Sequence, residues 1–146
     1  MTDHAMTDHA MPFAAAAPKR ATGRAMLWTG RVLSGLVAAF LALDAGIKLP
    51  PLQPVTDTMA ALGWPADAGT ARMLAALTLG AAALYVAPRT AVLGAILLTA
   101  YLGGAVATHV RIGSPLFTHS LFGVYVGVAA WAGLWLRDAR LRALLS

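Results

Sequence analysis

The sequence contains no cysteine and no glutamate, and only 12% of its 146 residues are charged. Without cysteine the chain has no disulfides, thiolate nucleophiles, thiol redox relays or cysteine metal sites. All six acidic residues are aspartates. No paired carboxylates, nucleophile elbow, phosphate-binding loop or HExxH motif occurs. The common sequence signatures of an enzyme are therefore missing, and the information lies in the apolar residues.

Hydrophobic residues make up 59% of the chain, which is too apolar for a soluble domain of this size. Four apolar stretches cover residues 26–49, 73–87, 90–110 and 116–136. The hydrocarbon core of a bilayer is about 30 Å thick and takes about 20 helical residues. The last two stretches reach this length, whereas the second needs its flanks or a thinned bilayer. We therefore predict an all-α fold, a four-helix transmembrane bundle formed by residues 25–146.

Residues 1–24 precede this bundle and are predicted to form a mobile, basic N-terminal tail. The pentad MTDHA occurs twice in residues 1–10, and a basic segment rich in proline and alanine follows. Basic residues before an apolar run also resemble a signal peptide. The run is too long and lacks a suitable cleavage site, so we expect it to be a retained first span.

The basic residues indicate how the chain is oriented. The net charge is +5, and Lys and Arg lie at the ends of the spans. One side carries eight of the 11 basic residues: Lys19, Arg20, Arg24, Arg31, Arg89, Arg137, Arg140 and Arg142. The positive-inside rule then predicts a multi-pass protein of the cell (inner) membrane with both termini cytoplasmic. No basic stripe is interleaved with aromatic residues on a soluble face, so nucleic acid is not expected as a partner.

The connection between the first two spans is predicted to carry a short helix on the outer surface. Residues 55–62 can form an amphipathic helix, with Val55, Met59 and Leu62 on one side. Gly63 suits its C-terminal cap, and Trp64 with the proline after it anchors the exit.

Small residues spaced four apart predict where the helices touch. Gly30 and Ser34 lie in the first span, Gly104 in the third, and Gly123 and Gly127 in the fourth. In lipid, close backbone approach and dispersion drive helix association, so such stripes mark contact faces. The contacts could form within one bundle or between copies of the chain.

Ionisable residues inside the spans are the best indicators of function. Asp44 and Lys48 are four apart with the acid first, the favourable order for an ion pair. His119 shares a helix face with Gly123 and Gly127, so it is expected to point into the bundle. Chain connectivity brings the ionisable groups to the outer side, and two tyrosines lie near the midplane. The candidates for a polar pocket are Asp44, Lys48, Arg72, Tyr101, His109, Arg111, His119 and Tyr125.

Each candidate also has a purely structural interpretation. The ion pair can serve only to end the first span inside protein, and Arg111 can be an interface anchor. The histidines can be neutral and bonded to backbone carbonyls. Two histidines and one carboxylate resemble a metal set, but no second acid is near, and we predict no metal site.

Several motifs resemble the DoxX-like family of small four-span membrane proteins. They are Asp44-Ala-Gly-Ile-Lys48, Leu62-Gly-Trp-Pro65, residues 88–94, Tyr101-Leu-Gly-Gly104, Thr108-His109-Val-Arg111 and residues 115–119. The resemblance keeps motif order over residues 27–145. It implies the fold and the membrane location. The family is named from a subunit of a thiosulfate:quinone oxidoreductase, and related redox partners use cysteines, which this chain lacks.

Three functions agree with these observations. The favoured one is a non-catalytic accessory or scaffold subunit of a membrane complex, linked to quinone and redox chemistry. The second is a small oxidoreductase that contacts quinone through His109, His119 and Tyr101. The third is a carrier or binding protein for a small hydrophobic or anionic ligand held by Lys48, Arg72 and Arg111. No cofactor is evident apart from quinone as a candidate; the expected partners are the bilayer, subunits of a membrane complex, or further copies of the chain.

Overall fold

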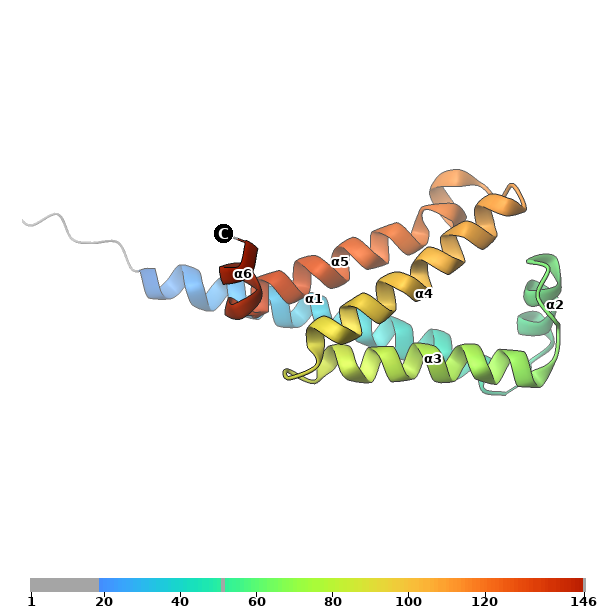
Figure 1. Cartoon of the computed structure of the whole chain (residues 1–146), viewed down its shortest axis with the longest axis horizontal. Helices are drawn as coiled ribbons and strands as arrows, with labels where there is room; N and C mark the ends of the chain where they lie inside the picture. The colour runs from blue at the N-terminus through green and yellow to red at the C-terminus, as the bar shows by residue number, and fades with distance from the viewer. Residues whose placement is uncertain (1–18, 51, 146) are drawn as a thin grey trace, which may run out of the picture.

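The computed structural model describes residues 19–50 and 52–145, and all of the regular structure in these segments is helical. This agrees with the predicted all-α class. In chain order, the elements are α1 (Lys19–Lys48), α2 (Gln53–Ala61), α3 (Ala68–Val86), α4 (Ala91–Arg111), the π-helix η1 (Leu116–Ser120), α5 (Phe122–Arg137) and α6 (Ala139–Leu145) (Figure 1).

Four helical segments are long and apolar enough to cross a membrane: Gly23–Lys48, Ala68–Val86, Ala91–Arg111 and Leu116–Arg137. Both α3 and α5 pack against α1, and both also pack against α4, so the four helices form a ring. Large apolar side chains such as Leu43 and Val128 project outward from it. Lipid chains solvate such side chains as well as a protein core does. The predicted four-helix transmembrane bundle is confirmed, and the chain is a multi-pass membrane protein.

Two helices begin earlier than the hydropathy pattern predicts. The second span starts at Ala68 and has 19 residues, because the Asp67 carboxylate accepts a 2.9 Å hydrogen bond from the Thr70 N–H and caps the helix. In α1, residues 19–24 are already helical, although they were assigned to the N-terminal tail. Residues 1–18 of that predicted tail lie outside the described residues.

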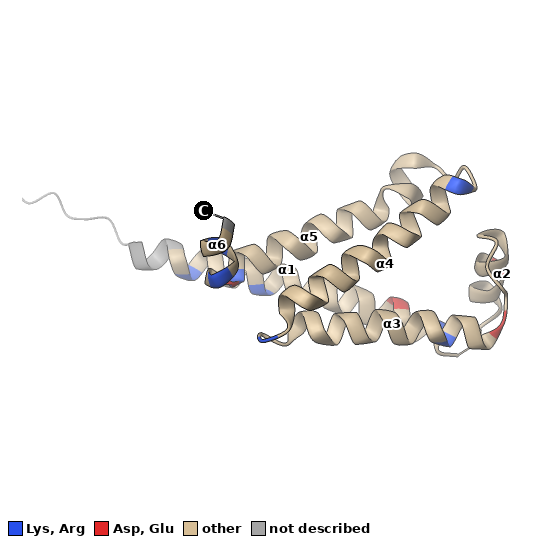
Figure 2. Cartoon of the chain, viewed as in Figure 1, with Lys and Arg blue, Asp and Glu red and all other residues tan. Residues whose placement is uncertain are grey.

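The charged residues divide the bundle into two ends (Figure 2). Most of the Lys and Arg residues coloured in Figure 2 lie in the first half of α1 and around the junction of α5 and α6. We call this the basic end and the opposite end the α2 end. The α6 helix was not predicted; its Leu141 is buried in the core next to the basic end.

The helices approach most closely toward the basic end. A Cβ atom on Gly30 would lie 2.7 Å from the Arg137 nitrogen, so α1 and α5 touch there through their backbones. Ser34 is buried beside it, and its hydroxyl forms a 2.9 Å hydrogen bond with the Tyr85 hydroxyl of α3. Gly30 and Ser34 thus lie where α1 packs against α5 and α3 within this chain.

The α4–α5 contact uses two of the predicted glycines but not the third. A Cβ on Gly123 would lie 2.9 Å from Val106 Cγ2, and one on Gly127 would lie 3.8 Å from Leu102 Cδ1. For Gly104 the predicted contact is wrong within this chain. A Cβ there would meet no atom of the described residues within 4 Å, because Gly104 faces away from the packed seam of α4.

From the turn at residues 87–90, α3 and α4 diverge toward the α2 end (Figure 1). The α2 helix lies across that end of the bundle. Its Met59 is buried, and the chain leaves it through Gly63 with φ of 73°, a backbone conformation that favours glycine. The predicted short helix and its glycine cap are thus confirmed, with bounds Gln53–Ala61.

Candidate functional site

A cavity of 610 Å³ occupies the α2 end of the bundle. This volume lies within the range of about 300–1,000 Å³ that is typical of small-molecule sites. Its charged and titratable side chains come from α1, α4 and η1, and its apolar wall is shared among the helices. The charged and titratable residues are Asp44, Lys48, Tyr101, His109 and His119. The apolar wall includes Phe40, Ile47, Met59, Leu62, Trp64 and Phe122.

Lys48, the last residue of α1, is held by two partners. Its Nζ donates to Asp44 Oδ2 over 2.5 Å, so the predicted ion pair forms, and it donates to the Tyr101 hydroxyl oxygen over 3.3 Å. The Lys48 and Asp44 side chains are 20% and 27% exposed. An ammonium carries three N–H donors. Among the described residues two of them are engaged, and the third N–H and the Tyr101 O–H are left to donate to a bound molecule.

His109 and His119 face one another across the cavity wall. Their ring centroids are 5.8 Å apart and their planes make an angle of 56°. His109 Nδ1 lies 3.0 Å from the Ser114 hydroxyl, and His119 Nδ1 lies 2.8 Å from the Thr118 hydroxyl. Each imidazole therefore has one nitrogen held by a hydroxyl group. The Nε2 atoms remain for a ligand, as donor or acceptor according to the tautomer.

The π-helical turn η1 sets the position of His119. The His119 and Ser120 amides both donate to the Pro115 carbonyl, at 3.1 and 3.2 Å. The Ser114 hydroxyl meets His109, and the widened turn places His119 on the cavity with its side chain exposed. Single-turn π-helices of this kind are frequent at functional sites.

Three of the predicted pocket residues lie outside the cavity wall. Arg72 Nε donates to the Leu49 carbonyl over 3.3 Å, and Arg111 Nη2 donates to the Leu62 carbonyl over 2.8 Å. Both arginines thus tie a helix end to the loops beside α2. Tyr125 lies on the surface of α5. A role for these three residues in ligand binding stays a prediction.

The aromatic wall of the cavity is the part that sequence reasoning missed. Phe40 and Phe122 make an edge-to-face contact with ring centroids 5.4 Å apart, and Trp64, which follows α2, lines the same cavity. One signal was present: Phe40 precedes Asp44 by four residues and so shares its helix face.

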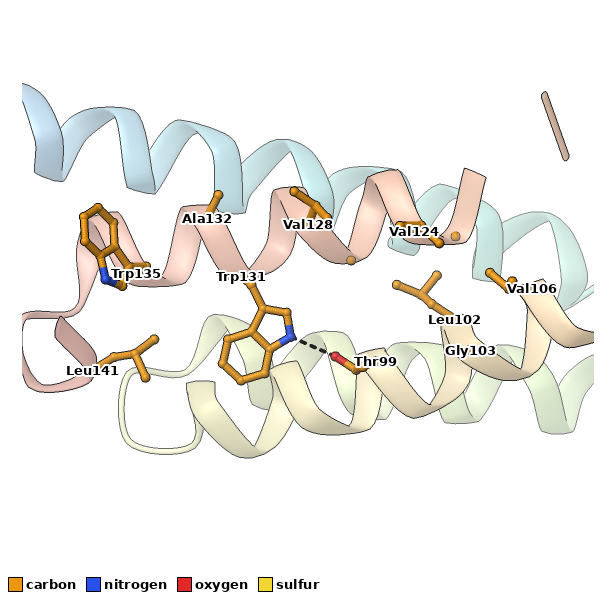
Figure 3. A pocket seen from close by; sticks show the side chains of 12 residues that line it. Thr99, Leu102, Gly103, Val106, Val124, Val128, Trp131, Ala132, Trp135 and Leu141 are labelled. Atoms are coloured by element: carbon orange, nitrogen blue, oxygen red, sulfur yellow. Dashed lines mark hydrogen bonds between the residues drawn. The ribbon is translucent and has the colours of Figure 1, made fainter. Parts of the chain in front are cut away.

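A second cavity lies along the seam between α4 and α5 (Figure 3). It measures 630 Å³ and is apolar. Trp131 Nε1 donates to Thr99 Oγ1 over 2.8 Å, so the polar atoms of these two lining side chains are already paired. This groove offers a polar ligand little to bind, and lipid chains suit it. The chemistry of the described residues is concentrated in the cavity at the α2 end.

The sequence matches a known protein family. The model of the DoxX-like family matches residues 32–133. The chain belongs to the DoxX-like family. The matched segment of this DoxX-like protein runs from α1 into α5 and includes all five charged and titratable residues of the cavity. No match was found among curated proteins or among solved structures. Family membership and the four spans together establish an integral membrane protein.

Proposed function

We propose that this DoxX-like protein binds a small amphipathic molecule of the quinone or quinol class in the cavity at the α2 end. We further propose that it does so as an accessory subunit of a membrane redox complex. The observation that carries the proposal is the convergence of Lys48, Tyr101, His109 and His119 on one cavity whose remaining wall is apolar and aromatic.

The chemistry of the two sides of the cavity suits such a molecule. On one side, Lys48 and Tyr101 can donate hydrogen bonds to a carbonyl oxygen. On the other, neutral imidazoles of His109 and His119 can donate to a carbonyl or accept from a hydroxyl. Aromatic side chains such as Phe40 pack well against a flat ring. Charged and titratable groups are expensive within a membrane, and groups retained there usually serve function.

The absence of cysteine supports an accessory role over an independent redox enzyme. No thiol can relay electrons in this chain. A small oxidoreductase would use the same cavity residues and differs in one readout, turnover of the quinone by the isolated protein. The anionic-ligand alternative is less favoured, because Arg72 and Arg111 bond to backbone carbonyls and Lys48 is paired with Asp44.

Binding can be tested on the purified protein in mild detergent. Mass spectrometry of its lipid extract should find a quinone, and decylubiquinone should raise the melting temperature, since a ligand at 100 times its Kd stabilises by about 2.7 kcal/mol. Tyr101→Phe should reduce that shift, whereas Tyr125→Phe, on the surface of α5, should leave it unchanged. A protein that copurifies with no quinone and is not stabilised by decylubiquinone would contradict the proposal. Reduction or oxidation of decylubiquinone by the isolated chain would favour the oxidoreductase alternative.

We also propose that both termini face the cytoplasm of a cell bounded by this (inner) membrane. The greater number of basic residues at the basic end supports this orientation. Because the chain has no cysteine, single cysteines can report it. With an impermeant maleimide on intact cells, Asp57→Cys in α2 should be labelled, and Gly23→Cys and Leu144→Cys should be protected. The reverse labelling pattern would invert the orientation.

A further inference from the structure

We propose that the ligand enters the cavity sideways from the bilayer, through an opening between α3 and α4 at Gly104. This inference rests on the proposed binding function and adds the route of entry. It also narrows the ligand to molecules that are dissolved in the membrane rather than carried in water.

The α2 helix and the residues that follow it cover the α2 end of the cavity. Leu62 and Trp64 line it from that side, and Met59 of α2 is buried. The 2.8 Å hydrogen bond from Arg111 to the Leu62 carbonyl joins the end of α2 to α4. A Cβ on Gly63 would lie 2.9 Å from Arg111 Nη2, so the guanidinium rests directly against the chain that leaves α2. A ligand arriving from water would have to displace these contacts.

The side between α1 and α5 is filled by aromatic rings. Phe40 of α1 and Phe122 of α5 meet edge to face. Both side chains line the cavity, and both also reach the lipid-facing surface, at 40% and 45% exposed. The pair therefore separates the cavity from lipid on this side.

The side of the cavity between α3 and α4 is lined by small residues, whereas the side between α1 and α5 is lined by the two phenylalanine rings. The two helices diverge toward the α2 end (Figure 1), and along the cavity α3 contributes only Leu74 among the described lining residues. On α4, the wall includes Ala100, Gly104 and Thr108. Gly104 is exposed, and a Cβ at this position would meet no described atom within 4 Å. No described side chain therefore packs against the cavity wall at Gly104.

The distance of Gly104 from the end of α4 determines whether the opening faces water or lipid. Gly104 lies seven residues before the end of α4 at Arg111, which is about 10 Å along a helix of 1.5 Å rise per residue. The opening therefore faces lipid chains. A hydrated anion entering there would lose its water and pay the cost of an unpaired charge in an apolar medium, whereas a lipophilic carbonyl compound already partitions there.

The route can be tested by blocking it. Gly104→Phe places a ring in the opening without a steric clash, and Gly103→Phe is the matched control. Gly103 is the neighbouring residue, also has no described atom near a Cβ, and lines the α4–α5 groove instead. Proteins in liposomes that contain an azido-quinone would be photolysed after short and long incubations. The labelling of cavity peptides would then be measured by mass spectrometry.

We expect Gly104→Phe to lower the initial rate of cavity labelling at least tenfold, with Gly103→Phe and Arg111→Ala close to wild type. If Gly104→Phe does not fold, Ala100→Phe blocks the same opening. Wild-type rates of cavity labelling in both blocking variants would overturn the route. Faster labelling in Arg111→Ala would also overturn it, because it would place entry at the α2 end of the bundle. No cavity labelling of wild-type protein even after long incubation would instead contradict the binding function, and the route with it.

Discussion

The Arg111 guanidinium donates a 2.8 Å hydrogen bond to the carbonyl oxygen of Leu62, joining the last turn of α4 to the end of α2. The two residues are far apart in sequence, and Leu62 lines the cavity. A hydrogen bond from a charged donor contributes about 1.5–3 kcal/mol when it is buried, and less at this exposed position. Replacing the donor should therefore loosen α2 rather than unfold the bundle.

Arg111→Ala should raise the hydrogen-exchange rate of the α2 amides about fivefold, corresponding to about 1 kcal/mol of opening free energy. Hydrogen exchange with mass spectrometry on protein in detergent would measure it. Arg140→Ala is a suitable control, because Arg140 lies at the basic end in α6. Equal exchange rates of the α2 amides in the wild type and in Arg111→Ala would show that this hydrogen bond does not stabilise α2.

The pair formed by Asp44 and Lys48 should be mutually dependent. Each side chain is about three-quarters removed from solvent at membrane depth. Removal of one partner leaves the other charge poorly compensated, at a cost of about 2 kcal/mol for a pair that is not fully buried. Asp44→Ala should thus lower the melting temperature, and Asp44→Ala combined with Lys48→Ala should recover part of the loss. Strict additivity of the two single effects would mean that the pair is not coupled.

The spans were predictable because the bilayer imposes a length and a composition on each of them. Their ends were less predictable. The first turns of α3 contain Gly69 and Arg72 and do not look apolar, so the helix start depends on the Asp67 cap, a local hydrogen bond that hydropathy does not register. The α6 helix was missed because its arginines resemble the basic flank of a final span.

The position of each candidate residue along the bundle was predictable from the sequence, but the direction in which its side chain points was not. Connectivity and helix length fix how far along the bundle each residue lies, and Asp44, Lys48, Tyr101, His109 and His119 do share one cavity. The side on which an arginine finds its partner depends on free backbone carbonyls at helix ends, as Arg72 and Arg111 show. These carbonyls depend on loop conformation, which residue spacing does not encode.

The contact between α1 and α5 should tolerate no side chain at Gly30. A methyl group there would meet Arg137 N, Leu136 Cβ and the Gly133 carbonyl at 2.7 to 2.9 Å, mostly backbone that cannot move aside cheaply. Gly30→Ala should cost about 1–3 kcal/mol through overpacking. Thermal denaturation in detergent would show it as a lowered melting temperature.

Gly35→Ala supplies the matched control on the same helix. Gly35 is exposed, and no described atom lies within 4 Å of the position of its Cβ. This substitution should be neutral or stabilising by up to about 1 kcal/mol, because alanine favours the helix. Equal destabilisation by both substitutions would show that the loss at Gly30 does not come from the α5 contact.

Acid should weaken the start of α3 through Asp67. Hydrogen bonds from the Thr70 hydroxyl and amide lower the pKa of Asp67 below its ordinary value. A carboxylate with a lowered pKa stabilises the folded state at neutral pH, and that contribution is lost as the pH falls through the folded-state pKa. Asp67→Asn retains a side-chain oxygen for the Thr70 amide but does not titrate. Between pH 7 and pH 3 the melting temperature of the wild type should therefore fall further than that of Asp67→Asn, since the remaining acidic groups are common to both proteins. Parallel falls would mean that the charge of the cap contributes nothing to the stability of α3.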